Sequence, residues 1–368
     1  MIYFDNSATT PMAKEAIDVF CEYMKNSFGN PSSRHALGLE SAKRLSAARK
    51  TVAKSMGVLP EEIYFTSGGT EGDNIALLGA ANIKKGRRIV TTAIEHPAVL
   101  RTSEHLEKQG FEVVRVMPKA DGNVLLSDIL DAVTPDTCLV SVMHVNNETG
   151  AVLPVDKIKA PLSRIAPRAH FHVDAVQSFG HIPFKPSLWG IDTAAVSSHK
   201  IHGPKGTGAL FVRKGAVLKQ SVFGGGQEKG LRSGTENVGA ICAFAAACSL
   251  INTADAERVK EIKAFLKDGL LSLGCVLNGS ETSSPYILNI SFPKIRSEIM
   301  LNALSNAGIC VSSGSACAAG AHTSHVLEAQ NAQYKDEAIR FSFSRYNTME
   351  EAEKALEEIA RIQKGLIR

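Results

Sequence analysis

The segment from Thr193 to Gly206 reads TAAVSSHKIHGPKG, and its two halves differ in character. Residues 193–197 are mostly small and apolar, whereas the residues after them are polar and include Lys200. A short apolar run bounded by turn residues such as Gly and Pro is typical of a buried strand. In open α/β sheets, ligands bind at the carboxyl ends of strands. The segment therefore predicts a buried strand that places Lys200 at a binding site.

The same pattern extends over much of the chain. From about residue 60 to 215, short β-branched runs alternate with helical patterns, which is typical of a mostly parallel sheet with helices on both faces. The sequence therefore predicts an α/β fold. The expected strands are residues 63–66, 88–92, 112–116, 138–144, 170–173, 193–197 and 209–213, and the expected helices are residues 41–56, 71–81, 98–109 and 238–250.

The pattern changes after residue 255. A charged helix is expected over residues 256–273, followed by separated strands at 286–291 and 338–342 and a terminal helix at 349–367. We expect residues 15–255 to form a large domain that holds the predicted site. Residues 1–14 and 256–368 are expected to form a smaller α+β domain.

Composition narrows the class of protein. The 368 residues are 44% hydrophobic and 21% charged, as in an ordinary globular protein, and the net charge of +4 favours no nucleic-acid partner. No signal peptide or membrane-spanning run is apparent. Seven cysteines without a C-x-x-C pair indicate reduced thiols, so a cytoplasmic location is expected, with no metal site.

Polar groups follow five of the expected strands. Because the carboxyl ends of parallel strands meet at one edge of a sheet, these groups are expected to converge on one site. They lie in the segments Ser67-Gly-Gly69-Thr70-Glu71, Glu95-His96, Asn146-Asn147-Glu148, Asp174-Ala-Val-Gln177 and Ser197-Ser-His199-Lys200.

Each of these residues also has a simpler structural interpretation. Lys200 could bond covalently to an aldehyde cofactor, or it could be a solvated loop lysine. Asp174 could keep a pyridine nitrogen protonated, or it could only cap a turn. His96 could lie against a planar ring, or it could cap the following helix. The glycine turn before Thr70 could bind a phosphate at a helix N-terminus, although neither a Walker loop nor a G-x-G-x-x-G loop is present.

Taken together, the motifs resemble class V aminotransferase-fold enzymes, and among them the cysteine desulfurases of the NifS/IscS type. The resemblance runs from residue 3 to about 350. It is carried by SSHKIHGPKG around Lys200, HVDAVQ around Asp174, NNETG around Asn147, and the segments 3–11 (YFDNSATTP), 224–235 (GGGQEKGLRSGT), 312–317 (SSGSAC) and 339–342 (IRFS).

The resemblance implies a fold-type I transferase dependent on pyridoxal 5'-phosphate, acting on L-cysteine as a homodimer. Lys200 would carry the cofactor and move the substrate α-proton, while Asp174 would pair with the pyridine nitrogen. Gln177 would bond the ring hydroxyl oxygen, and the catalytic His96 would stack on the ring. The phosphate would be held by Gly69, Thr70, Ser197 and His199, with the partner subunit's Thr235, and the substrate carboxylate by Asn147 and Arg340.

Cys317 distinguishes members of the fold. It lies among Ser, Ala and Gly residues, which would make a poor core, whereas Cys310 is expected to be a buried apolar residue. The resemblance implies that Cys317 takes the sulfur as a persulfide, releases alanine, and passes the sulfur to an acceptor protein for iron–sulfur cluster assembly or for thiolation of tRNA or a cofactor. The alternatives are a selenocysteine lyase, another class V enzyme on the same cofactor, or a non-catalytic interaction scaffold.

Overall fold

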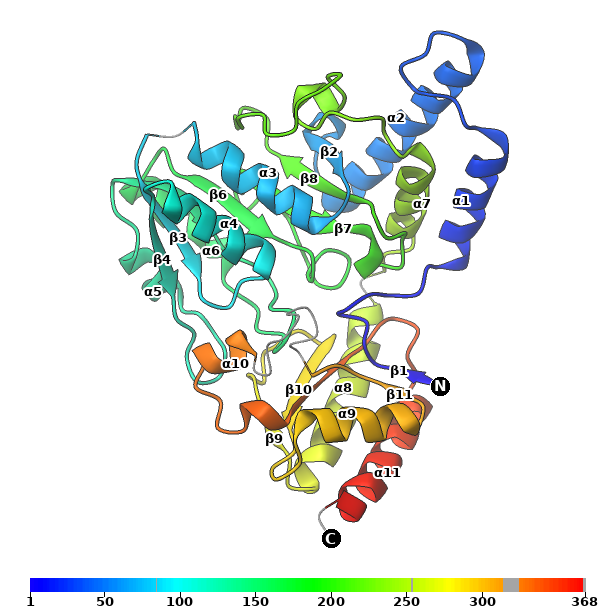
Figure 1. Ribbon diagram of the computed structural model, residues 1–368, viewed down its shortest axis with the longest axis vertical. Coiled ribbons are helices and arrows are strands. Elements are labelled where there is room, and N and C mark those ends of the chain that lie inside the picture. Colours follow the sequence, from blue (N-terminus) through cyan, green and yellow to red (C-terminus); the bar gives the residue numbers. More distant parts are fainter. Residues whose placement is uncertain (84, 253, 314–323, 367–368) are drawn as a thin grey trace.

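The computed structural model describes residues 1–368 except 84, 253, 314–323 and 367–368 (Figure 1). A seven-stranded sheet forms the centre of the larger part, in the order β2-β8-β7-β6-β5-β3-β4. Strand β8 runs antiparallel to both of its neighbours, and the other pairings are parallel. The expected mostly parallel α/β sheet is therefore confirmed. Its strands are β2 (Ile63–Thr66), β3 (Arg88–Thr92), β4 (Glu112–Val116), β5 (Thr137–Ser141), β6 (His170–Asp174), β7 (Thr193–Ser197) and β8 (Gly208–Val212).

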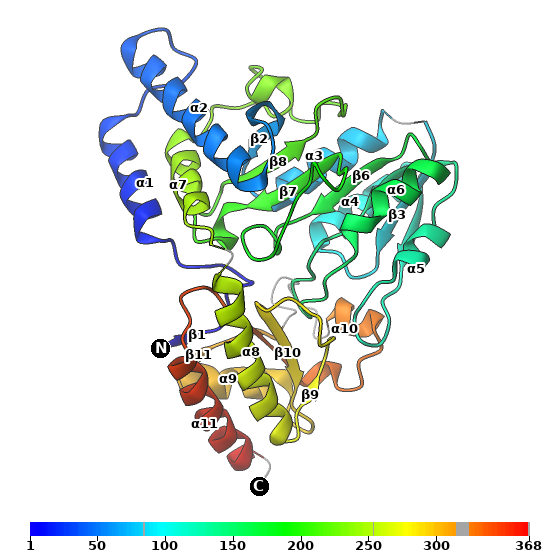
Figure 2. The same ribbon diagram turned by 180° about the vertical axis from the view of Figure 1, so that it is seen from behind.

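Helices cover both faces of this sheet, as the two opposite views show (Figures 1 and 2). Successive strand residues point to opposite faces, so Leu139 and Leu210 pack in one apolar cluster while Val140 and Phe211 pack in another. The first face is covered by α3 (Gly69–Ala81) and α4 (Pro97–Lys108). The second face and its flank carry α1 (Lys14–Asn26), α2 (Ala36–Met56), α5 (Leu126–Asp131), α6 (Val155–Ile165) and α7 (Val238–Ser249).

A second, smaller core forms at the other end of the molecule. The N-terminal segment joins it, since Phe4 is buried there with its ring centroid 5.1 Å from that of Phe343. The division at residues 15 and 255 remains a prediction. The elements here are β1 (Ile2–Tyr3), α8 (Asp255–Ser272), β9 (Val276–Leu277), β10 (Ile287–Ser291), α9 (Ser297–Asn306), β11 (Ile309–Cys310), β12 (Ala338–Ser342) and α11 (Met349–Leu366), whereas α10 (His325–Ala329) packs Val326 into the larger core.

Some expected boundaries were wrong. Strand β5 ends at Ser141 rather than at residue 144, although the N–H groups of Val142 and His144 still donate to carbonyl oxygens of β6. The helix expected from residue 41 begins at Ala36, where the His35 side chain caps it. Helices α1, α5, α6, α9 and α10 were not among the expected helices, and α6 has Pro161 in its interior, where proline interrupts the helical pattern. Within the described part of the chain, no helix is long and apolar enough to cross a membrane.

Candidate active site

A cavity of about 210 Å³ lies at the carboxyl edge of the large sheet. The segments that follow β2, β3, β5, β6 and β7 all reach it, and β12, an edge strand of a three-stranded sheet with the order β12-β10-β9, adds one residue. The structure thus brings together ten of the predicted site residues. They are Gly69, Thr70, His96, Asn147, Asp174, Gln177, Ser197, His199, Lys200 and Arg340.

Lys200 follows β7 in a single 3₁₀ turn, Ser198–Lys200. Its Nζ donates hydrogen bonds to the carbonyl oxygens of Ser7 and, at 2.9 Å, of Ala8. Both residues line the cavity, and neither was predicted to belong to the site. The only available signal was the motif at residues 3–11, which contributed to the resemblance without any role being assigned to it.

Asp174 ends β6 and is 5% exposed. Its Oδ1 accepts a hydrogen bond of 2.9 Å from the N–H of Val176, so the simple turn role is present. The side chain also lines the cavity. Burial raises the pKa of this carboxyl, while His96 and Lys200 nearby oppose the rise.

His96 shows the same combination of roles. Its Nδ1 accepts a hydrogen bond of 3.1 Å from the N–H of Ala98 and thereby caps α4, while the ring lines the cavity. Burial lowers the pKa of this imidazole, so the neutral ring is favoured. Capping fixes one edge of the ring, and this holds the side chain in place at the cavity.

One end of the cavity is suited to a phosphate. Gly69 and Thr70 are the first residues of α3, whose leading N–H groups have no partner within the helix and carry the positive end of the helix dipole. A Cβ on Gly69 would lie 2.4 Å from Cγ2 of Val176, so glycine is what allows this close approach. Ser197 and His199 come from the end of β7, and burial lowers the pKa of His199 to about 4.

Arg340 reaches the cavity from β12. Its Nη1 donates to the carbonyl oxygen of Asn147 at 3.0 Å, and its Nη2 lies 2.9 Å from Oδ1 of Asp5. Its Nε is buried without a hydrogen-bond partner among the described residues. Asp5 was not predicted, because its pairing with Arg340 joins the two ends of the chain.

Two buried carboxyls near Asp174 had no role assigned from the sequence. Asp73 lines the cavity, and burial raises its pKa well above the usual range, with Asp174 and Glu95 adding to the effect. Burial likewise raises the pKa of Glu95 to about 8. Asp73 follows Thr70 by three residues, and this helical spacing could have placed both on one face of α3.

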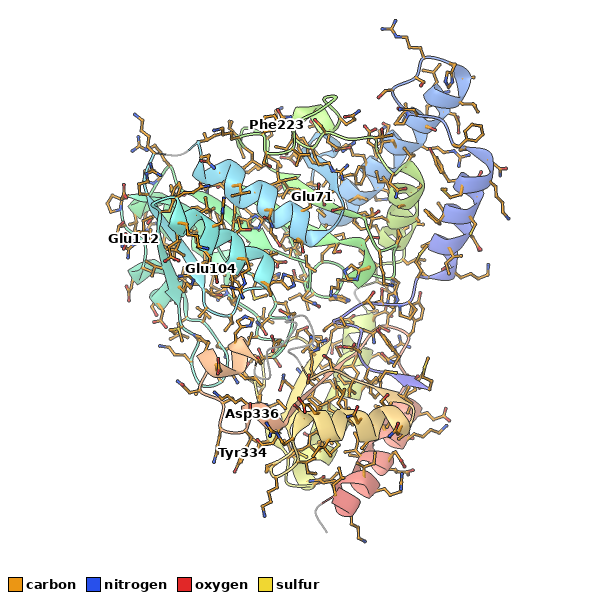
Figure 3. The ribbon with its side chains drawn as sticks, viewed as in Figure 1. Glu71, Glu104, Glu112, Phe223, Tyr334 and Asp336 are labelled. Atoms are coloured by element: carbon orange, nitrogen blue, oxygen red, sulfur yellow. The ribbon has the colours of Figure 1, made fainter. Side chains whose placement is uncertain are left out.

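One predicted residue that the structure describes is not in this cavity. Thr235 lines a separate hollow of about 200 Å³ together with Ser67. The segment that contains Thr235 is joined to α3 by an ion pair, 3.0 Å between Nε of Arg232 and Oε1 of Glu71, the latter labelled in Figure 3. Cys317 lies outside the described residues.

The described residues that flank 314–323 lie close to the cavity. The N–H of Ser312 donates to the carbonyl oxygen of Arg340 at 3.2 Å. On the other side, the hydroxyl of Ser324 donates to the buried carboxyl of Glu148, the neighbour of Asn147.

Comparison with known proteins identifies the family. The aminotransferase class-V model matches residues 2–355. The chain belongs to the aminotransferase class-V family. One relative in this family, the putative cysteine desulfurase IscS 1 of Bacillus subtilis (strain 168), is 42% identical, with 99% of each chain covered. The cysteine desulfurase IscS of Dictyoglomus turgidum is 39% identical over 98% of this chain and 94% of its own.

Solved structures agree with this assignment. A NifS-like protein superposes with a TM-score of 0.94 at 39% identity, covering 99% of this chain and 100% of its own. A structure described as SspA in complex with cysteine has a TM-score of 0.84 at 31% identity, covering 95% of this chain and 100% of its own. These similarities place the chain in the NifS/IscS group and confirm the expected fold class.

Proposed function

We propose that this protein is a pyridoxal 5'-phosphate-dependent cysteine desulfurase, which converts L-cysteine to L-alanine and keeps the sulfur on Cys317 as a persulfide. The observation that carries the proposal is that Lys200, the buried Asp174 and Arg340 line one cavity. Relatives at about 40% identity over nearly the whole chain are named cysteine desulfurases, which supports the same conclusion.

The donor set at the cavity fits the cofactor. Lys200 is the only lysine among the described lining residues, and its amine can bond to an aldehyde. The α3 N-terminus suits a phosphate, and a carboxylate at Asp174 suits a protonated pyridine nitrogen. When bound, the cofactor would act as an electron sink that weakens bonds at the substrate's α and β carbons.

The protein's own residues would bind and orient the substrate. Arg340 has an unpartnered Nε–H beside Nη groups that are held by Asn147 and Asp5, so its fork is already fixed for a carboxylate. The amine of Lys200 would take the α-proton and return a proton to the product. The neutral His96 would pack against the ring without adding positive charge.

Sulfur transfer balances without an added oxidant. The thiolate of Cys317 would form an S–S bond to the substrate sulfur as the Cβ–S bond breaks. The electron pair of the broken bond remains on Cβ, which takes a proton and becomes the methyl group of alanine. An acceptor protein would then collect the persulfide sulfur for cluster assembly or thiolation.

We further propose a homodimer. Thr235 lies outside the Lys200 cavity of its own chain, as expected if it serves the cofactor phosphate of the other subunit. A two-fold pair is the commonest arrangement for such an exchange. Light scattering should give twice the 39.3 kDa chain mass. An active monomer would remove Thr235 from the site.

Mass spectrometry after incubation with L-cysteine tests the function. The protein should gain the mass of one sulfur atom on the peptide that contains Cys317, with one equivalent of alanine released in the first turnover. Cys310→Ser, which changes a cysteine on β11 that is half-buried rather than buried as expected, should keep the adduct, and Cys317→Ser should lose it. Sulfur on another cysteine, or alanine formation without any adduct, would refute the assignment.

A further inference from the structure

The polar side chains of strand β6 lie on one face of the sheet, from the amino end of the strand to its carboxyl end. His170, His172 and Asp174 alternate with Phe171 and Val173, which pack in the cluster on the opposite face. Asp174 reaches the cavity at the carboxyl edge. His170, at the amino end of the strand, lines a different hollow of about 480 Å³.

Hydrogen bonds connect the two ends of this row. Nε2 of His170 lies 2.8 Å from Oγ1 of Thr193, which lies 2.9 Å from Nδ1 of His172. Nε2 of His172 lies 3.1 Å from Oδ1 of Asp73, which lines the cavity. Thr193 is the β7 partner of His172 in the sheet register, and Asp73 comes from α3. None of these four residues is more than 1% exposed.

The pKa shifts of His172 and Asp73 favour the uncharged forms of both side chains. Burial lowers the pKa of His172 to about 3, and the neighbouring His170 contributes to the shift, so the His172 ring is neutral near pH 7. Burial raises the pKa of Asp73 well above its usual range, and the Asp174 and Glu95 carboxyls that face it act in the same direction. With the His172 ring neutral, its contact with Asp73 is a hydrogen bond rather than an ion pair, and the raised pKa of Asp73 favours the carboxylic acid as the donor.

A threonine hydroxyl has one proton, so Thr193 can donate to only one of its two imidazoles and must accept from the other. When Asp73 is protonated, it donates to Nε2 of His172. His172 then donates from Nδ1 to Thr193, and Thr193 donates to Nε2 of His170. Every hydrogen bond in the series is satisfied, and both rings carry their proton on Nδ1.

The opposite direction of donation also satisfies every hydrogen bond in the series. If Asp73 ionises, its proton passes to Nε2 of His172, the Nδ1 proton of His172 passes to Thr193, and the Thr193 proton passes to Nε2 of His170. His170 then releases its Nδ1 proton to water in the hollow. One O–H bond is lost at Asp73, one proton is released, and both rings now carry their proton on Nε2.

We propose that Asp73, His172, Thr193 and His170 form a proton relay between the carboxyl pair Asp73–Asp174 and solvent at the opposite edge of the sheet. The relay lets Asp73 gain or lose a proton beside Asp174 while a ligand fills the cavity. The proton leaves to water in the hollow, whose wall also holds the Asp192 carboxylate, paired with Lys159 and Arg213. The use of the relay in catalysis rests on the proposed function, whereas its existence does not.

Histidine ring NMR on ¹⁵N-histidine-labelled, cofactor-free protein tests the relay. The chain has 11 histidines, and single His170→Gln and His172→Gln variants would assign the two rings. As pH rises, both rings should move from Nδ1-protonated to Nε2-protonated forms with one common midpoint. Thr193→Val removes the shared hydroxyl, so the two rings should then change independently, with midpoints that differ by more than half a pH unit.

Two control variants separate the relay from a general effect on packing. Thr193→Ser restores a hydroxyl and should restore the common midpoint. Thr91→Val removes a buried hydroxyl of β3 that has no partner among the described residues, and should leave the midpoint unchanged. Rings protonated on different nitrogens in the unaltered protein, or a common midpoint that persists in Thr193→Val, would overturn the proposal. Coupled rings in a protein that forms no persulfide would instead refute only the proposed function.

Discussion

Replacing Glu95 with glutamine should change how stability depends on pH. Glu95 is fully buried, and its Oε1 accepts hydrogen bonds of 2.8 Å from both Thr92 Oγ1 and the N–H of Met143. Its Oε2 has no partner among the described residues. Burial raises the pKa from 4.5 to about 8, so near pH 7 the folded protein holds a proton here that the unfolded chain has released.

The sign follows from proton binding. Between the unfolded pKa of 4.5 and the folded pKa of about 8, the folded state binds more protons, so stability falls as pH rises. The slope is at most about 1.4 kcal/mol per pH unit, or about 2.5 kcal/mol between pH 5 and 7. Glutamine keeps the Oε1 acceptor and cannot ionise, so Glu95→Gln should gain about this much over the parent protein across that interval.

Thermal unfolding of cofactor-free protein provides the assay. A chain of 368 residues has an unfolding entropy of about 0.8 kcal/mol/K, so the Tm difference between variant and parent should widen by about 3 °C from pH 5 to 7. Glu104→Gln is the control, on an exposed part of α4 (Figure 3), where the pairing with Arg101 contributes little. Parallel Tm curves for Glu95→Gln and the parent would refute the reasoning.

Three substitutions test the proposed roles at the cavity. After borohydride reduction, the cofactor should be bonded to Lys200, lost in Lys200→Ala and kept in Lys205→Ala, as peptide mapping would show. Asp174→Asn removes the carboxylate that would pair with the protonated pyridine nitrogen. If the transition state loses the full value of such a buried charge pair, about 3–5 kcal/mol, kcat should fall at least roughly 100-fold. Near-normal turnover would leave Asp174 as a turn residue only. Arg340→Lys replaces a fixed fork with a single ammonium, so KM for L-cysteine should rise about 10- to 100-fold while the bound cofactor absorbs normally; an unchanged KM would place the carboxylate elsewhere.

The strands could be predicted where their signal is local. Thr193–Ser197 is a short apolar run followed by turn residues, and the structure has the same bounds. Helix α6 lacks such a local signal, because Pro161 lies in its interior, while its Ile158 and Leu162 are buried in the core beside the sheet. Local pattern fails where tertiary contacts outweigh propensity.

The same contrast between local signals and tertiary contacts applies to the residues of the site. Residues at strand ends, such as Lys200, could be predicted because topology brings those ends together. Ser7 and Asp5 could not, since their contacts with Lys200 and Arg340 join segments 193 and 335 residues apart. Asp73 could be predicted only in part. Its helical spacing from Thr70 was visible in the sequence, but only the fold shows that His172 on β6 is its hydrogen-bond partner.

For His96 and Asp174, the structural and functional interpretations are not alternatives. Most buried polar side chains are hydrogen-bonded, and each of these uses one atom to accept a bond from a nearby backbone N–H. That bond fixes the side chain's orientation without occupying the rest of its surface. The capped ring can still present a face to the cavity, and the Asp174 carboxyl has a second oxygen for a ligand. A cap or turn role therefore favours the functional assignment, because a site that must hold its groups in one geometry benefits from anchoring them in the backbone.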